Sequence, residues 1–408
     1  MALPPDASWR PSRFTAWGKP REPCCARKNA STGARRHADA AWRTFPHREH
    51  AGVERLQRSP WPTWPVSPGR LTPRGAQGAA LLGRQDRSYF NKTGVLSPQV
   101  CPTPGAVVAL ASSAPRAIDT AKAWVDAAFP GCGIAVAHPH SDREDALFHP
   151  LSNPKADFDG HAAWLEAMRA LPQGGMAGLK ARHSAEIRLL AAVLGCSLPD
   201  CDLAGELASV LEKPHDRPNL TGVFEIGTTA SQNLLLEYLE GMSMSEVGWG
   251  RASERTIERL LAFHPIEFRY SNRLASVARI AGGPLATLMA NTLSSTGANG
   301  TITLLAGHDT NIADVASLLA LHWKIPSYPR DEVPPASALG FELWADAEGH
   351  RFVRAFFRSP TMRGLRNLDA TPPRRRYLDI PGCGRAGHVR SCTAEHFLEL
   401  VRQAVDRP

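Results

Sequence analysis

The 408-residue sequence predicts an α/β fold: a mostly parallel sheet with flanking helices plus an inserted α-helical cap domain. Two apolar runs, at residues 106–112 and 301–306, have the length and composition of buried strands, and a helical pattern follows each of them. Residues 155–294, between these units, show mainly helical periodicity. This order implies a sheet domain into which a helical cap is inserted.

Each predicted element has a local signal in the sequence. The strand at 106–112 leads into a helix at 116–128. The cap contains a loop at 214–219 and amphipathic runs, which we expect to be helices, at 160–171, 183–194, 228–240, 253–264 and 268–294. The strand at 301–306 is followed by four further elements: a helix at 310–321, two strands at 340–344 and 352–357 that flank a hairpin turn at 347–350, and a helix at 394–405.

The predicted elements divide the chain into three parts. Residues 1–58 form an irregular basic segment, which we expect to be disordered or translated in a wrong frame. Residues 59–150 and 295–408 form the α/β domain, and residues 151–294 form the inserted helical cap. The part after residue 58 is long enough to bury two hydrophobic cores.

The basic character of the chain is concentrated in its first segment. Residues 1–58 contain twelve Lys and Arg against five Asp and Glu, which accounts for +7 of the formal charge of +8. The segment has no periodicity and no pattern of aromatic residues, so a wrong frame or start is favoured over a solvated tail, and both are favoured over a nucleic-acid-binding arm. We therefore expect no nucleic-acid partner. Residues 1–19 lack the apolar stretch of an export signal, and no apolar run in the chain is long enough to span a membrane.

Six of the eight cysteines fall into near pairs along the chain. The pairs are Cys101 with Cys132, Cys196 with Cys201, and Cys383 with Cys392, whereas the adjacent Cys24 and Cys25 lie in the irregular segment. Even numbers at short spacing indicate a disulfide framework and an oxidising compartment, and the alternative is six buried free thiols.

The stretch with the most chemical information follows the strand at 301–306. The chain breaks at Gly307, and a helical pattern begins just after Asp309. His308 and Asp309 therefore lie where a strand leads into a helix N-terminus, a place that favours anionic ligands. An imidazole and a carboxylate there can supply a hydrogen-bond donor and a general acid, or they can simply cap the helix.

The sequence Ala-Gly-His-Asp-Thr-Asn at 306–311 resembles the catalytic signature of the histidine acid phosphatases, a family that includes periplasmic phytases and glucose-1-phosphatases. Roughly residues 59–405 share this resemblance. Further motifs occur in the family's order at 61–66 and 71–75, at Arg116 with Thr120, at 147–151, at 248–251 and from 334 to 392. Several separated motifs in order are more specific than a likeness of fold alone.

The resemblance implies a phosphoglycerate mutase-like fold, a periplasmic or secreted location and disulfides within the three cysteine pairs. It also implies hydrolysis of phosphomonoesters, phytate or sugar phosphates, with a mild preference for phytate. In such a mechanism a histidine attacks phosphorus and water then releases phosphate from the phosphohistidine. Arg116 and His308 would bind the phosphate, and Asp309 would protonate the leaving alkoxide. We expect a monomer whose partner is a phosphorylated small molecule, with no cofactor, no metal and no membrane contact.

The family's nucleophile motif, Arg-His-Gly-x-Arg-x-Pro, is missing. The nearest match is Arg-His-Ala-Asp-Ala at 36–40, which makes His37 a weak candidate for the nucleophile. Loss of this motif implies loss of its strand as well, so we expect the chain to fold poorly and to lack phosphatase activity. The alternative to an enzyme is a non-catalytic, degenerate relative that retains a phosphate-binding cleft.

Other polar residues have simpler interpretations. His138, His140 and Asp142 are expected to form a polar loop rather than a metal site. His149 and His264 are expected to be loop or core histidines, with a weaker indication that they border the pocket.

Overall fold

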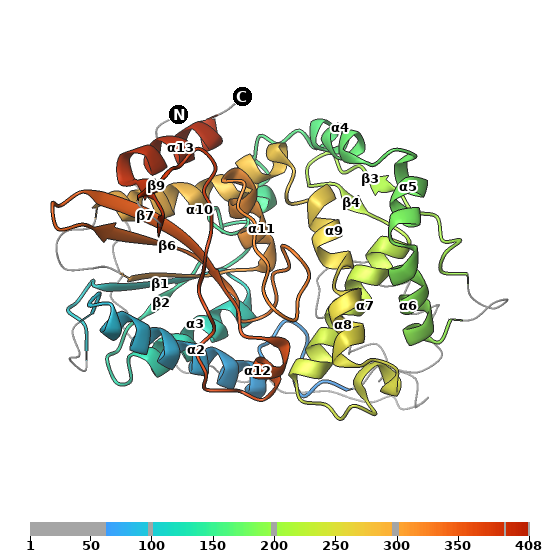
Figure 1. Cartoon of the computed structure of the whole chain (residues 1–408), viewed down its shortest axis with the longest axis horizontal. Helices are drawn as coiled ribbons and strands as arrows, with labels where there is room; N and C mark the ends of the chain where they lie inside the picture. The colour runs from blue at the N-terminus through green and yellow to red at the C-terminus, as the bar shows by residue number, and fades with distance from the viewer. Residues whose placement is uncertain (1–62, 97–100, 197–201, 296–301, 387–388, 407–408) are drawn as a thin grey trace, which may run out of the picture. The chain divides into compact units, whose positions relative to one another are not determined.

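The computed structural model describes residues 63–96, 101–196, 202–295, 302–386 and 389–406 (Figure 1). Its parallel sheet and many helices confirm the predicted α/β fold. The irregular segment 1–58, and His37 within it, lies outside the described residues.

A parallel sheet of three strands carries the residues of greatest interest. Its central strand is β1 (Val107–Ala111), with β2 (Val136–Ala137) on one side and β5 (Ile302–Ala306) on the other. Val107 pairs with Ile302 and Ala111 with Ala306, so β1 and β5 end at the same level. The segments that follow these two strands therefore meet at one edge of the sheet, where ligands bind in open α/β folds.

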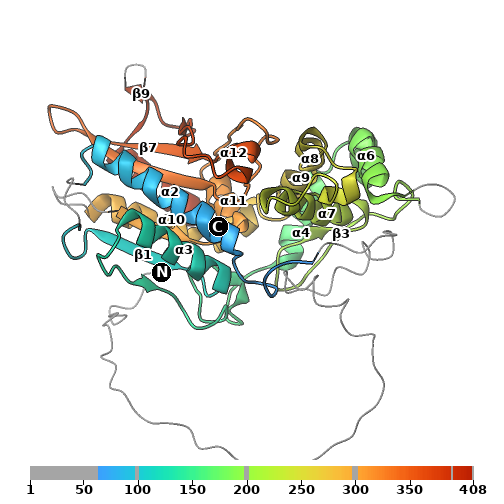
Figure 2. The same cartoon turned by 90° about the horizontal axis from the view of Figure 1, so that it is seen from below.

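Two long helices lie side by side next to this sheet, α2 (Pro73–Lys92) and α3 (Pro115–Ala128) (Figures 1 and 2). Gly83 permits their close approach, because a Cβ atom there would lie 2.3 Å from the carbonyl oxygen of Trp124. The apolar pattern of the sequence predicts no element at α2. Thr72 nevertheless starts this helix by accepting a hydrogen bond from Gly75 N, with a proline at the first helical position.

A second, antiparallel sheet is built on the predicted hairpin of β6 (Ala338–Ala345) and β7 (Arg351–Arg358). The short strands β8 (Arg376–Tyr377) and β11 (Cys392–Thr393) pair with β7. Among the described strands, β5 pairs only with β1 and β6 only with β7. Within those residues, each of these two strands therefore has one edge without a strand partner.

The region predicted to be a cap is mainly helical. Its helices are α4 (Gly160–Ala170), α5 (Gly175–Arg182), α6 (Ser184–Leu194), α7 (Val223–Leu239), α8 (Glu254–Leu260), α9 (Phe263–Tyr270) and α10 (Ala275–Ser295), with a short β3–β4 ladder (Val210–Leu211 and Asn219–Leu220) between α6 and α7. The boundaries of the cap domain stay a prediction. The prediction of a single helix at 253–264 is wrong, because the helix is interrupted between α8 and α9. Pro265 has no N–H to donate to Leu261, so α8 cannot continue through it.

The helix predicted at 268–294 is also two helices, and residues 271–274 separate α9 from α10. At this break the side chain of Asn272 donates to Asp314 on α11 (Asp309–Leu318). The close packing of α10 on α11 depends on Gly282, where a Cβ atom would lie 2.8 Å from the carbonyl carbon of Asp314. These contacts fix the helix that begins at Asp309.

Disulfides tie the chain at the expected positions. Cys101 is bonded to Cys132, and Cys383 to Cys392. Cys196 is also disulfide-bonded, and its expected partner Cys201 lies outside the described residues. None of the helices in the described ranges has the length and hydropathy needed to cross a membrane. The terminal helix α13 (Ala394–Asp406) follows β11 directly and packs on α10.

Candidate functional site

The turn from β5 into α11 presents His308 and Asp309 as expected. His308 is the residue before the helix, and its backbone N–H donates to Asn311 Oδ1 at 2.9 Å. Asn311 Nδ2 in turn donates to the carbonyl of Phe148 at 2.8 Å, which fastens the turn to the loop before His149. Gly307 is required here, because a Cβ atom would lie 2.6 Å from the Phe148 ring.

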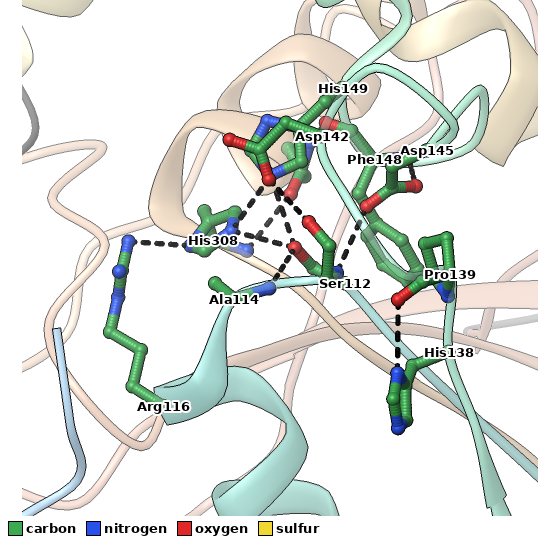
Figure 3. A network of polar contacts seen from close by, with 12 residues as sticks. Ser112, Ala114, Arg116, His138, Pro139, Asp142, Asp145, Phe148, His149 and His308 are labelled. Carbon is green, nitrogen blue, oxygen red and sulfur yellow. Dashed lines mark hydrogen bonds and ion pairs between the residues drawn. The ribbon is translucent and has the colours of Figure 1, made fainter. Parts of the chain in front are cut away.

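The turn from β1 into α3 brings Arg116 to the same place. Arg116 Nη2 lies 3.0 Å from His308 Nδ1 (Figure 3). Ser112, the first residue after β1, places its Oγ 3.0 Å from His308 Nε2. Thr120 Oγ1 donates to the carbonyl of Arg116 at 2.7 Å, one turn further along α3. The two residues expected to bind phosphate, Arg116 and His308, therefore meet across adjacent parallel strands.

His149 lies next to His308 and Ser112. Its Nε2 lies 3.2 Å from His308 Nε2 and 3.0 Å from Ser112 Oγ (Figure 3). Asp142 Oδ1 lies 3.9 Å from the same nitrogen. His149 lies in a loop, as one of the two expectations has it, and its ring reaches the residues that the sequence predicts to bind phosphate.

The charge state of His308 follows from its surroundings. Burial, then the charge of Arg116 and then that of His149, lower the pKa of His308 to about 4. Its imidazole is therefore neutral in weakly acidic and neutral solution. Among the described residues, the site then holds one permanent cation, Arg116, beside a neutral ring that can donate one hydrogen bond.

Asp309 faces a different and deeply buried partner. His264 Nε2 lies 3.5 Å from Asp309 Oδ2, and His264 Nδ1 lies 2.8 Å from Glu332 Oε1. Gln232 Nε2 donates to that same Glu332 oxygen at 3.2 Å. The side chain of Asp309 is 41% exposed, whereas His264 and Glu332 are buried. Asp309 thus forms the accessible end of an Asp–His–Glu chain.

The contacts among Asp309, His264 and Glu332 determine the charges of these side chains. Burial alone would lower the pKa of His264, but the charge of Glu332 and the hydrogen bond to Asp309 raise it to about 10. The protein around Asp309 favours the neutral acid, yet the hydrogen bond and charge of His264 bring its pKa down to about 2. In the free site Asp309 is therefore ionised and His264 is a cation, opposite in state to His308.

Several of these residues carry no strong signal in the sequence. Ser112 could have been suspected because it directly follows a buried strand, as Gly307 and His308 follow β5. Glu332 and Gln232 lie in segments of the chain that the sequence does not connect. Only the fold brings them behind Asp309.

The described residues include two compact groups of potential metal ligands. The groups are Asp346, Glu348 and His350 on the hairpin turn, and His396 beside the Cys383–Cys392 disulfide. In the loop expected to be polar, His138 Nδ1 lies 3.0 Å from the Pro139 carbonyl and Asp142 accepts from Ser113.

Comparison with known proteins gives consistent matches over most of the chain. A family model described as histidine phosphatase superfamily (branch 2) matches residues 29–166 and 259–358. Phytase AppA of Escherichia coli (strain K12) is 29% identical over 372 residues, covering 84% of this chain and 85% of that protein. Glucose-1-phosphatase of Salmonella typhimurium is 27% identical, covering 79% and 80% of the two chains. The structure of the phytase from Citrobacter braakii superposes with a TM-score of 0.80 at 27% identity, covering 86% of this chain and 92% of that one.

Proposed function

Because the chain belongs to the histidine phosphatase superfamily (branch 2), we propose that its site hydrolyses phosphomonoesters, phytate or sugar phosphates, through a phosphohistidine. The observation that carries this proposal is the approach of Arg116 Nη2 to His308 Nδ1 at the carboxyl ends of β1 and β5. The phytase and glucose-1-phosphatase among its relatives support the same class of substrate.

Arg116 and His308 have the groups that a transferring phosphoryl group requires. Charge in the transition state is spread over three equatorial oxygens, so catalysis depends mainly on positioning and positive charge. The planar guanidinium of Arg116 can donate to two of these oxygens. The neutral ring of His308 can donate to a third through Nε2.

Asp309 is the proposed general acid, although it is ionised in the free site. A phosphate dianion bound next to the carboxylate raises the pKa of that carboxylate by like-charge repulsion. Asp309 would then take up a proton from weakly acidic solution and deliver it to the leaving alkoxide. Because His264 lowers the pKa of Asp309, the protonated form requires both bound substrate and acidic solution.

The nucleophile is not assigned. The sequence lacks the Arg-His-Gly-x-Arg-x-Pro motif, and the weak candidate His37 lies outside the described residues. A second candidate function is therefore a non-catalytic relative that binds phosphate.

The disulfides support a periplasmic or secreted location for this function, since such bonds persist in oxidising compartments. The choice between phytate and sugar phosphates rests on the relatives, and we favour phytate. We also propose that the protein acts as a monomer.

Turnover and binding assays on the full chain distinguish the two candidate functions. Release of phosphate from phytate, glucose-1-phosphate and p-nitrophenyl phosphate would be measured in weakly acidic buffer for the wild type, His308→Ala and Asp309→Asn. His350→Ala, which changes an exposed histidine on the hairpin, is the matched control. If the protein is a hydrolase, Asp309→Asn should lower the rate of phosphate release from phytate by about 100-fold or more. The rate with p-nitrophenyl phosphate should fall less, because its leaving group needs little protonation.

Each outcome of these assays has a definite meaning. Turnover that is lost in His308→Ala supports the hydrolase, and His37→Ala then tests the weak nucleophile candidate. Phosphate binding without turnover supports the non-catalytic relative, as the sequence leads us to expect for this chain. A folded chain with neither property contradicts both.

A further inference from the structure

His149 lies in the candidate site without a role in the mechanism proposed above. It precedes the short helix η1 (Pro150–Ser152), and its side chain is 24% exposed. Its Nε2 points to the same spot as His308 Nε2 and Ser112 Oγ (Figure 3). Two ring nitrogens at 3.2 Å share one proton in a hydrogen bond, or they repel each other if both carry one.

The position of that shared proton follows from Arg116. A guanidinium donates hydrogen bonds and cannot accept them, so His308 Nδ1 accepts from Arg116. The neutral ring of His308 therefore carries its proton on Nε2, which points to Ser112 and His149. His149 in its neutral form accordingly presents the lone pair of Nε2 to the site.

Protonation of His149 changes this arrangement. Two N–H groups would then face each other at 3.2 Å, close to the guanidinium of Arg116. An oxyanion placed between the rings would accept from both, and it would also neutralise the charge of Arg116. The site is therefore built so that a proton on His149 and an anion stabilise each other.

Other charged groups around His149 act in both directions. On its own loop, Asp142 lies 3.9 Å away and favours the protonated ring, while the carboxylate of Asp145 accepts from the N–H groups of Ser113 and Phe148. From α3, Arg116 opposes protonation. From α11, Asp309 favours it but is already paired with His264.

We propose that His149 is a further phosphate-binding residue, which takes up a proton when an oxyanion binds and exchanges the His149–His308 hydrogen bond for two N–H···O bonds. The proton comes from solvent and no covalent bond changes. That the oxyanion is the phosphoryl group of a substrate rests on the proposed function, whereas the proton uptake does not.

Calorimetric titration with sulfate tests this proposal, because sulfate itself neither gains nor loses a proton near neutral pH. The binding enthalpy would be measured near neutral pH in two buffers of different ionisation enthalpy, for the full chain and for His149→Asn. We expect the wild type to take up about one proton per sulfate bound, and the variant close to none. Loss of one charge-assisted hydrogen bond should also weaken sulfate binding about tenfold or more in weakly acidic buffer.

His140→Asn is the matched control, since His140 lies exposed on the same loop and should leave uptake and affinity unchanged. Equal proton uptake in the wild type and His149→Asn overturns the proposal, and so does a wild type that binds sulfate without proton uptake or does not bind it. Proton-coupled sulfate binding without phosphatase activity would leave this inference standing while the proposed hydrolase fails. Turnover with an uncoupled sulfate site would give the reverse result.

Discussion

The buried carboxylate of Glu332 helps to keep His264, the partner of Asp309, protonated. Glu332→Gln removes the charge of this carboxylate with little change of shape. Glu332 Oε1 lies 2.8 Å from His264 Nδ1, and the side chain is fully buried. At an effective dielectric constant of about 20, two unit charges at this separation attract each other by roughly 6 kcal/mol. Part of that attraction offsets the desolvation of both groups, and the amide can still accept a hydrogen bond. We therefore expect a loss near the low end of the ~3–5 kcal/mol range for breaking buried pairs.

The pH dependence gives this prediction a second, independent readout. The pKa of His264 rises from 6.5 to about 10 on folding, so its contribution to stability is complete below pH 6.5 and is lost as the pH rises toward 10. Urea unfolding of the wild type and Glu332→Gln would be compared near pH 6 and in alkaline buffer, with the exposed Glu348→Gln as the control. The deficit of the variant should be largest near pH 6 and should shrink at alkaline pH. A deficit below about 0.5 kcal/mol near pH 6, the size expected for a surface change, would refute the reasoning.

Three other predictions concern stability. Gly83→Ala should cost about 1–3 kcal/mol, because the new Cβ would lie 2.3 Å from a carbonyl oxygen of α3, whereas Gly384→Ala, which meets nothing within 4 Å, should be nearly neutral in chemical denaturation; equal effects would contradict the packing. Burial raises the pKa of Glu267 from 4.5 to about 8, so the melting temperature should fall as the pH rises through this interval, and Glu267→Gln should flatten the dependence; an unchanged slope would count against it. Replacing both Cys101 and Cys132 by serine removes a disulfide that joins residues 31 positions apart, and it should lower the free energy of unfolding by about 2–4 kcal/mol. A wild-type melting curve that reducing agent leaves unchanged would contradict this.

Periodicity was sufficient to predict the elements that bury one apolar face. The strands at β1, β5, β6 and β7 and the helices α3, α4, α6 and α13 lie close to their predicted ranges. No element was predicted at α2, although a threonine followed by a proline marks the start of this helix in the sequence. Periodicity failed at Pro265, where a missing N–H divides a continuous helical pattern into α8 and α9.

The site was predictable where its residues follow strands, and not where the fold alone brings them together. Arg116 and His308 each follow a strand, and because β1 and β5 are parallel neighbours their side chains meet. His149 reaches them from a loop whose path no local pattern determines. The ionised state of Asp309 depends on His264 and on Glu332, which lie 45 residues before and 23 residues after it in the chain.

Phosphate binding by the full chain tests the central claim most directly, because it needs Arg116 and His308 but no nucleophile. Inorganic phosphate would be titrated into the wild type and Arg116→Ala in weakly acidic buffer, with Arg70→Ala as the control on an arginine whose side chain is 56% exposed. Loss of the charge-assisted hydrogen bonds of Arg116 should weaken binding by roughly 10- to 100-fold, and the control should bind like the wild type. The assignment of this site would be contradicted if the wild type does not bind phosphate, or if Arg116→Ala binds it as tightly as the wild type does.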